Sequence, residues 1–368
     1  AGRIQTFDDT FEDGPVHPGT TSVSTALAVA ETFDISGAEF FAAVLAGYET
    51  SVRLSIALSR SHYGSGFHNT GTCNTFGACA AAARAAGLDA DAVADALGIA
   101  GGAAAGLRQY QLDGSMSDSA LHAARAAQSG VTAVALQRAG LRGPHGVIDG
   151  TWGLLRTMSH DSRPEEIAHA LGSRYAFAAT SLKPYPSCRF THGPIDELLA
   201  LRSRYRLEPQ SIESIEIATF RESIDVADRP KIGSPSEAIM SHQYAAARAL
   251  LDGTVTLEDF AVARIEERPV RALAERVQVV YDSSLQTAYP AAWPHRVTVR
   301  CTDGRRLVAE SLHPPGSSEV PLDDERVRRK FAELVDPVLG AERRKNVAQL
   351  VERLEEVERV SELACALR

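Results

Sequence analysis

The spacing of apolar residues changes near Lys183, and this change constrains the fold more than any other feature of the chain. Before it, apolar residues recur every three to four positions, as at Phe40, Val44, Tyr48 and Val52, which is the spacing of an amphipathic helix. After it, short runs rich in β-branched residues are separated by turn residues and helical stretches. We therefore predict a mainly α fold: an all-helical bundle domain followed by a smaller α+β domain.

Local signals predict where the helices of the first half begin and end. Ser36 and Glu39 form a capping box, a helix over 75–86 ends at Gly87, and Asp89 caps the next helix. Glycines at 98, 102 and 106 have a spacing that lets helices approach closely, which predicts the tightly packed centre of the bundle. Further helices are expected at 117–128, at 131–139 and, after a Ser162/Glu165 capping box, at 164–171.

The second half is expected to contain a small sheet. Strands are predicted at 212–217, 277–281, 297–301 and 307–309, with Asp303-Gly304 as a two-residue hairpin turn. Helices are expected at 194–204 and 236–251, and charged helices at 323–335 and 341–367 should pack back on the first domain. The predicted domains are 1–181 (helical), 182–313 (α+β) and 314–368 (C-terminal helices).

Composition limits the partners of the protein. A formal net charge of −9 and the lack of a basic run disfavour nucleic acid and anionic membranes, and no run of about 20 apolar residues predicts a membrane span. The five cysteines are scattered without metal-binding spacing, which fits a reducing, cytoplasmic setting. Since the chain starts with Ala1 rather than Met, we expect an upstream segment.

Histidines lie in four polar, turn-rich motifs that we expect to meet in one cleft. Each motif alone also has a structural interpretation: a turn histidine, a half-buried helix residue or a rigid connector. The pair Asp8-Asp9 fits a turn or helix start better than a metal site, and the separate histidine motifs predict no metal ligation. The four motifs are Asp8-Asp9-Thr10 with His17-Pro18-Gly19, Gly66–Thr72 around His68, Leu121-His122 with Arg125, and Lys183–His192.

Together with Thr75-Phe76-Gly77 and Ala96–Gly101, these motifs resemble the MmgE/PrpD family, from about residue 7 to the C-terminus. That family includes 2-methylcitrate dehydratase, cis-aconitate decarboxylase and iminodisuccinate epimerase. The resemblance implies a helical domain, an α+β lid domain, a pocket between them and a homodimer. It also implies catalysis without a metal or other cofactor.

The resemblance nominates His17 as the principal acid/base, with His68 sharing the proton transfers. Removing a proton beside a carboxylate builds up negative charge, which fixed cations and hydrogen-bond donors must stabilise. Histidine can accept and return a proton near neutral pH. The expected substrate-binding residues are Asp9, Thr10, Ser119, His122, Lys183, Cys188, Arg189, His192 and Tyr244.

Three positions depart from the family pattern. Thr6 stands where many members have Asp. Ser119 stands where many have Lys, and without that ammonium we expect a substrate with less negative charge. Cys188 stands where decarboxylase-like members have His and dehydratase-like members commonly have Cys. The leading hypothesis is a lyase that dehydrates a small β-hydroxy carboxylate. The alternatives are an epimerase or isomerase that exchanges an α-proton, a decarboxylase, and a non-enzymatic scaffold in a biosynthetic complex.

Overall fold

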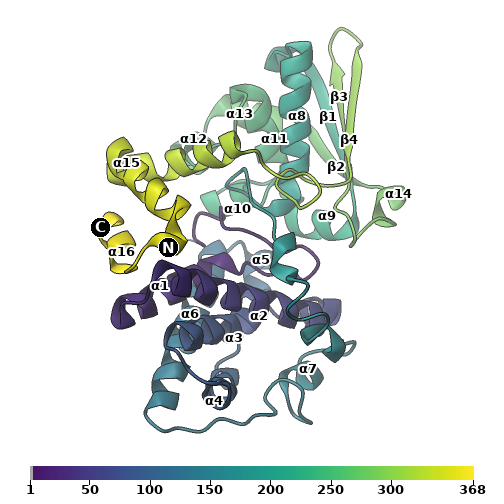
Figure 1. Ribbon diagram of the computed structural model, residues 1–368. Coiled ribbons are helices and arrows are strands. Elements are labelled where there is room, and N and C mark those ends of the chain that lie inside the picture. The colour runs from purple at the N-terminus through teal and green to yellow at the C-terminus, as the bar shows by residue number, and fades with distance from the viewer. Residues whose placement is uncertain (1–2) are drawn as a thin grey trace. The chain divides into compact units, whose positions relative to one another are not determined.

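The computed structural model describes residues 3–368 and divides them into two compact units, whose elements are labelled in Figure 1. The helical unit comprises residues 9–109, 118–180 and 323–368, and the α+β unit comprises residues 3–8, 110–117 and 181–322. The sequence places residues 3–8 and 110–117 in the helical domain, whereas the structure groups both segments with the α+β unit. The mainly α fold with a smaller α+β part is confirmed.

The helical unit is built around α3, a helix of small residues. Of its residues, all but Ala80 and Arg84 are buried, so neighbouring helices cover it on every side. Both α1 and α2 pack on α3 and on each other. The helices of the unit are α1 (Gly19–Phe33), α2 (Gly37–Gly64), α3 (Asn69–Ala85), α4 (Ala90–Gly101), α6 (Met116–Arg138), α7 (Leu154–Thr157), α15 (Asp324–Glu352) and α16 (Ser361–Ala366), with 3₁₀ turns η1 (Pro164–Ile167), η2 (Ala176–Ala179) and η6 (Leu354–Glu356).

The predicted caps at α2 and α4 are confirmed. Ser36 Oγ accepts the Glu39 N–H at 3.3 Å, and the Glu39 carboxylate accepts the Ser36 N–H at 3.0 Å, which closes the capping box. The Asp89 carboxylate accepts the Ala92 N–H at the start of α4. Helix α3 begins at Asn69, six residues before the predicted start, because polar side chains in its first turns are buried inside the unit.

Close helix packing occurs at glycines other than the predicted series. A Cβ on Gly77 of α3 would lie 2.6 Å from the Gly47 carbonyl oxygen of α2, so a side chain there would push the two helices apart. In the predicted series, Gly98 approaches the chain at Gly143, and positions 102 and 106 lie beyond the end of α4. The prediction of a helix-packing series at 98, 102 and 106 is therefore wrong.

Two further expectations in this unit need correction. The stretches 117–128 and 131–139 form the single helix α6, because Gly130 serves close packing rather than a break: a Cβ there would lie 2.5 Å from the Cys79 nitrogen of α3. At 164–171 only the 3₁₀ turn η1 forms, without a side-chain cap. The guanidinium of Arg53 binds the carbonyls of Glu166, Ile167 and His169, and this holds the segment in a non-helical path.

The C-terminal helices are grouped with the helical unit. Helix α15 bends at Gly340, where φ is 76°. Val347 and Leu350 of α15, together with Val360 and Leu363, join the core cluster that also holds residues of α1, α2 and α3.

The α+β unit contains one mixed sheet with strand order β2-β1-β3-β4. Strands β1 and β2 are parallel, and the other two pairs are antiparallel. The strands are β1 (Ile212–Thr219), β2 (Val277–Tyr281), β3 (His295–Cys301) and β4 (Arg306–Ser311); the helical elements are α5 (Gln109–Asp113, mostly in this unit), α8 (His192–Tyr205), α9 (Arg221–Ala227), α10 (Pro235–Ile239), α11 (His242–Asp252), α12 (Val262–Ile265), α13 (Arg268–Ala274), α14 (Ser283–Gln286), and 3₁₀ turns η3 (Arg189–Thr191), η4 (Pro209–Ser211) and η5 (Glu258–Phe260).

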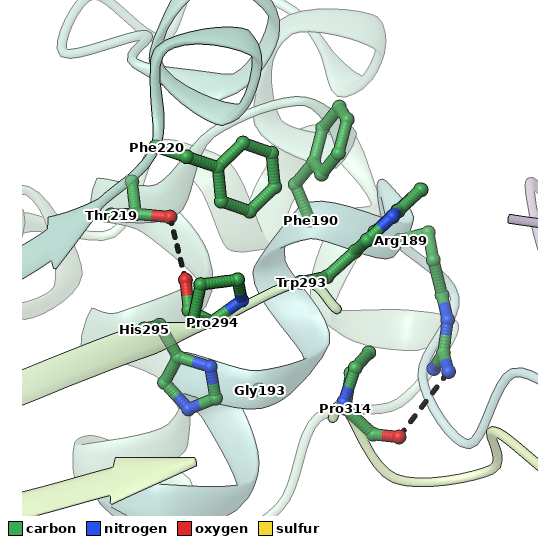
Figure 2. A pocket seen from close by; sticks show the side chains of 9 residues that line it. All are labelled: Arg189, Phe190, Gly193, Thr219, Phe220, Trp293, Pro294, His295 and Pro314. Atoms are coloured by element: carbon green, nitrogen blue, oxygen red, sulfur yellow. Dashed lines mark hydrogen bonds between the residues drawn. The ribbon is translucent and has the colours of Figure 1, made fainter. Parts of the chain in front are cut away.

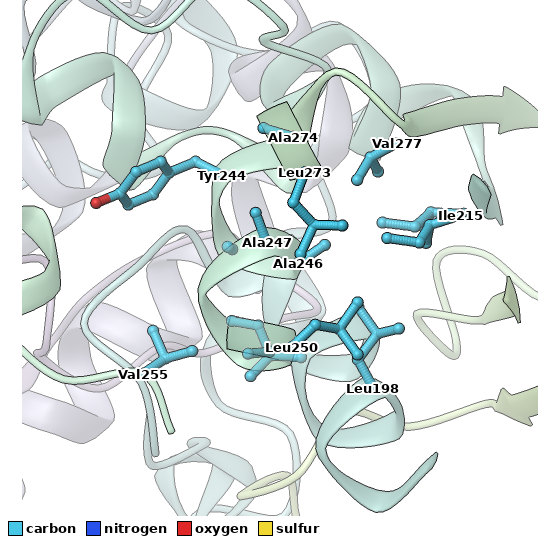
Figure 3. Packing of buried hydrophobic residues seen from close by; sticks show 14 of the residues in the cluster. Leu198, Ile215, Tyr244, Ala246, Ala247, Leu250, Val255, Leu273, Ala274 and Val277 are labelled. Atoms are coloured by element: carbon cyan, nitrogen blue, oxygen red, sulfur yellow. The ribbon is translucent and has the colours of Figure 1, made fainter. Parts of the chain in front are cut away.

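Helices α8 and α11 pack on each other and on the sheet to form an apolar core (Figure 3). Ile215 and Ile217 of β1 and Val297 and Val299 of β3 point into it, since alternate residues of a strand face the same side. The predicted strands are confirmed.

Two local predictions in this unit are wrong. The β3–β4 turn has three residues, 302–304, because the Cys301 N–H bonds the Arg305 carbonyl and only Gly304 has a positive φ, as in a type I turn with a bulge. The expected helix 236–251 is divided into α10 and α11, since Ser241 accepts the Tyr244 N–H and starts a new helix.

By length and composition, α2 could cross a membrane, but 56% of its most apolar 18-residue window is buried inside the protein. Core helices pass the same test, so this is weak evidence for a span.

Candidate active site

His17 is fixed by its own loop and by helix α3. Its backbone N–H donates to Thr70 Oγ1 (3.2 Å), and its carbonyl accepts from Asn74 Nδ2 (2.8 Å). The ring Nδ1 lies 2.6 Å from the Asp9 carbonyl oxygen, and Thr10 Oγ1 is 3.1 Å from the same nitrogen. Because a carbonyl only accepts, Nδ1 carries the proton, and the lone pair of the partly exposed ring lies on Nε2.

Asp9 and Thr10 position His17 from the other side. The Asp9 carboxylate accepts the N–H of Gly19 in the first turn of α1, at 3.1 Å. Through this contact the acidic side chain of Asp9 stabilises the N-terminus of α1. The sequence predicted only a substrate contact for Asp9, not this structural role. Thr10 is buried, and its hydroxyl lies against the imidazole. The structure thus brings Asp9, Thr10 and His17 together.

His68 and His122 form a second histidine group in the helical unit. His68 precedes α3 and is buried, and its Nδ1 lies 2.9 Å from Nδ1 of His122 on α6. Nε2 of His122 lies 3.3 Å from Oδ2 of Asp118, one turn earlier on α6. Ser119, beside Asp118, is buried as well. Asp118 was not among the predicted site residues. An acid four residues before a histidine on a helix nevertheless indicates that the two side chains are neighbours.

Lys183 sits in a buried group of charges in the α+β unit. Its Nζ donates to the Thr6 carbonyl at 2.9 Å and lies 3.9 Å from Asp8 Oδ1. Arg3 Nη1 is 2.8 Å from the same Asp8 oxygen. Burial lowers the pKa of Lys183 to about 7, an effect that Asp8 opposes. Asp8 stood in a predicted motif only as a turn or helix-start residue, and Arg3 stood in none, because short sequence motifs do not reveal their spatial proximity to Lys183.

Cys188 interacts electrostatically with Lys183. Burial raises the pKa of its thiol, against the opposing effects of Lys183 and Arg3. The side chain is therefore a neutral thiol at physiological pH and does not serve as an anionic base.

The structure corrects the predicted substrate contacts of Arg189 and His192, which hold loops together. Arg189 Nη1 donates to the Pro315 carbonyl at 2.6 Å, and Nη2 lies 3.4 Å from that of Pro314 (Figure 2). His192 is fully buried, with Nε2 3.2 Å from the Ser187 carbonyl and Nδ1 3.4 Å from Arg189. The pocket that Arg189 helps to line has a volume of about 10 Å³, which accommodates at most one water molecule.

Tyr244 is also corrected, because it belongs to the apolar core of the α+β unit (Figure 3). Its hydroxyl donates to the Asp259 carbonyl and accepts from Arg248 Nε at 3.0 Å. Its ring packs on Phe260. The family resemblance predicts that Tyr244 reaches a substrate. The small alanine side chains beside it, however, leave room for its ring in the core.

No group of three or more His, Cys, Asp or Glu side chains within residues 3–368 is arranged to hold a metal ion.

The helical unit thus carries histidines held by polar contacts, and the α+β unit carries a buried lysine. The MmgE/PrpD N-terminal domain matches residues 1–167, and the MmgE/PrpD C-terminal domain matches residues 185–356. The chain belongs to the MmgE/PrpD family, which confirms the resemblance seen in the motifs.

Curated relatives of this chain include cis-aconitate decarboxylases. The enzyme of Aspergillus terreus is 27% identical over 97% of this chain and 77% of its own length. A cis-aconitate decarboxylase-like protein of Aspergillus oryzae is 26% identical over 97% and 78%, and the enzyme of Mus musculus is 26% identical over 98% and 75%.

Proposed function

We propose that this protein is a cofactor-independent enzyme that transfers protons on a small carboxylic acid, and that its reaction is the dehydration of a β-hydroxy carboxylate. Membership of the MmgE/PrpD family and relatives named cis-aconitate decarboxylase support a small acid as substrate. The observation that carries the proposal is the fixed tautomer of His17, with Nδ1–H on the Asp9 carbonyl.

His17 is the proposed base. The backbone N–H, the backbone carbonyl and the ring Nδ1 of His17 each make a hydrogen bond, and together these bonds orient the Nε2 lone pair. Little reorganisation therefore precedes proton abstraction. The ring also lies just before the first turn of α1, and the positive end of a helix dipole disfavours the imidazolium, which keeps the base neutral between turnovers.

Lys183 is the proposed carboxylate anchor. Burial has lowered its pKa to about 7, so a bound carboxylate would shift it toward the ammonium form. The charge group of Arg3, Asp8 and Lys183 contains two basic side chains and one acidic one, a balance that favours an anionic ligand. An ammonium beside the carboxylate stabilises the negative charge that develops when the neighbouring carbon loses its proton.

The proposed reaction balances as follows. His17 Nε2 takes the proton from the carbon next to the carboxylate, and the electron pair of that C–H bond forms the C=C bond while the C–O bond to the hydroxyl breaks. Protonated His68 gives its Nε2 proton to the departing hydroxyl, which leaves as water. Exchange with solvent then returns both histidines to their starting states.

Decarboxylation is the second candidate, because the relatives that match over nearly the whole chain are named decarboxylases. The same groups would serve it: a carboxylate leaves as carbon dioxide, and an imidazolium protonates the carbon. The neutral thiol at Cys188, where decarboxylase-like members have His, favours dehydration. Ser119, where many family members have Lys, favours a less charged acid. We also propose a cytoplasmic homodimer, which light scattering of the purified protein would test.

Incubation with a panel of β-hydroxy, cis-unsaturated and chiral acids in heavy water, followed by mass spectrometry, tests the proposal. Loss of water from a β-hydroxy acid is the expected result, and activity should survive dialysis against EDTA. Loss of carbon dioxide would assign the decarboxylase, and deuterium uptake without a leaving group would assign an epimerase. Silence across the panel would contradict the proposal and favour a scaffold.

A further inference from the structure

We propose that Asp118 and His122 act as positioning residues for His68, fixing its tautomer and stabilising its protonated form. This inference rests on the proposed function and assigns a role to a pair of side chains that the reaction above leaves unused. The contacts run in sequence from the Asp118 carboxylate through the His122 ring to the His68 ring, all within the helical unit.

With both histidines neutral, the donors and acceptors of this chain of contacts have one consistent assignment. The ionised Asp118 carboxylate only accepts, so His122 carries its proton on Nε2, 3.3 Å from Asp118 Oδ2. Neutral His122 then has its lone pair on Nδ1, and this nitrogen accepts the Nδ1–H of His68 at 2.9 Å. The lone pair of His68 lies on Nε2 as a result. An aspartate that orients a histidine in this manner also sets which nitrogen can take or give a proton.

The same arrangement stabilises charge on His68. His68 directly precedes the 17-residue helix α3, and the positive end of that helix disfavours an imidazolium. Its ring is 2% exposed, so solvent contributes little to stabilising the charged form. The Asp118 carboxylate, acting through the polarisable imidazole of His122, supplies the negative charge that stabilises the imidazolium of His68. Asp118 itself is 49% exposed, so its own ionised form is well solvated.

Ring contacts support a defined geometry rather than chance proximity. The His68 and His122 ring centroids lie 5.1 Å apart with the planes inclined by 51°, which points one nitrogen at the other. Gly106 lies against the His122 ring, and a Cβ at this position would be 3.3 Å from His122 Nδ1. The absence of a side chain at Gly106 therefore leaves room for the ring. In this arrangement His68 would touch the substrate, and Asp118 and His122 would act only through it.

The test combines kinetics with nitrogen-15 NMR of histidine-labelled protein. Asp118→Ala should lower kcat about ten- to a hundredfold, less than the roughly 10²–10⁴-fold contributed by an acid–base group itself because Asp118 acts through His68, with KM changed less than about twofold. Asp118→Glu should recover much of the loss. Asp91→Ala is the matched control, because Asp91 also lies exposed in the first turn of a helix of the same unit, and it should leave kcat unchanged.

The NMR spectrum reads the tautomer without any turnover, with His68 assigned by the spectrum of His68→Gln. Wild-type His68 should show a protonated Nδ1 and an unprotonated Nε2, and Asp118→Ala should convert it to a mixture of tautomers while Asp91→Ala does not. A protonated Nε2 in neutral wild-type His68, or an unchanged His68 spectrum together with unchanged kcat in Asp118→Ala, would overturn the inference. If the tautomer shifts as expected but no acid is turned over, the positioning role stands and the proposed function fails.

Discussion

The histidines of the two units are held in opposite ways. In the helical unit, His17 and the pair His68 and His122 contact carbonyl, hydroxyl and carboxylate groups that set which nitrogen carries the proton. In the α+β unit, His242 and His295 are buried in surroundings that lower their pKa values to about 3 and about 4, mainly by desolvation. The rings of the first group are oriented by polar contacts, whereas desolvation favours the neutral form of the second group.

This contrast shows that the number of histidines near a motif says little about catalysis. His192, which stands in the same motif as Lys183, uses one nitrogen on the Ser187 carbonyl and the other on Arg189. His17 instead uses one nitrogen to fix its tautomer and has its lone pair on the other, in a partly exposed ring.

The comparison predicts opposite phenotypes for His17→Ala and His192→Ala. His17→Ala should lower kcat/KM by about 10²–10⁴-fold, the usual contribution of a general acid or base, while its melting temperature stays close to wild type. His192→Ala should lower the free energy of unfolding by about 1–3 kcal/mol, because it leaves buried hydrogen-bonding groups without their partner. Kinetics and thermal denaturation of both variants measure this, with the exposed His160→Ala as control. Equal loss of stability in both variants would make His17 a structural turn residue.

Lys183→Met should abolish most activity and yet stabilise the fold. The pKa of Lys183 is about 7 in the folded protein against an ordinary 10.5, so the unfolded chain binds the proton more tightly between these values. The wild type is therefore penalised most at or below pH 7, and the penalty fades as pH rises toward 10.5. Denaturation curves across this range should show the advantage of Lys183→Met shrinking with pH, while exposed Lys231→Met tracks wild type.

The activity of the wild type should also depend on the protonation of Lys183, but it should fall with rising pH whereas the stability rises. Since the ammonium form binds the carboxylate, kcat/KM should fall as pH rises above about 7. A kcat/KM profile that stays flat from pH 6 to pH 9 would remove Lys183 from substrate binding.

Acid should destabilise the protein through His242 and His295. Both stay neutral when folded, to about pH 3 and about pH 4, whereas their ordinary pKa is 6.5. The unfolded chain thus binds more protons below pH 6.5, and stability falls from there toward pH 4. His242→Gln should show a shallower fall than the wild type in denaturant titrations at successive pH values. A slope identical to wild type would mean that His242 is protonated in the folded protein.

Ser119→Lys should change the order of preferred acids by a smaller factor. An added ammonium beside a substrate carboxylate strengthens binding of di- and tricarboxylates, and it weakens a substrate without a matching charge. Ser119 is 1% exposed on α6, so the lysine also costs stability. Ser129→Lys, at a half-buried position, controls only for the addition of a lysine to the same helix. Paired kinetics on mono- and polycarboxylates measure the change. If both proteins keep the same preference order, Ser119 is not a specificity position.

The sequence predicts the fold well where one local signal decides it. The Ser36/Glu39 capping box, the Asp89 cap and the alternation in β1 and β3 are set by neighbours in sequence. The errors arise where distant residues decide. Gly130 looks like a helix break until its contact with α3 is known, and the segment after Pro164 is held in an irregular path by Arg53, more than a hundred residues away.

The site could be predicted only in part for the same reason. His17, Thr10, His68 and His122 stand in motifs, and the structure brings them into two groups. Tyr244 and Arg189 have the right chemistry, but their polar atoms are engaged by Asp259 and by the prolines at 314 and 315. Arg3 and Asp8 contact each other and Lys183 across more than 170 residues of sequence, and no local pattern reports that proximity.

Deuterium incorporation from heavy water tests most directly the claim that proton transfer resides with the histidines of the helical unit. The substrate found in the panel would be incubated with wild type, His17→Gln and, under conditions where it remains folded, His192→Gln. The recovered acids would then be analysed by mass spectrometry over time. We predict that wild type and His192→Gln dehydrate the acid and, through the reverse hydration, place deuterium at the carbon beside the carboxylate, and that His17→Gln does neither above background. Incorporation by His17→Gln at the wild-type rate would contradict the account.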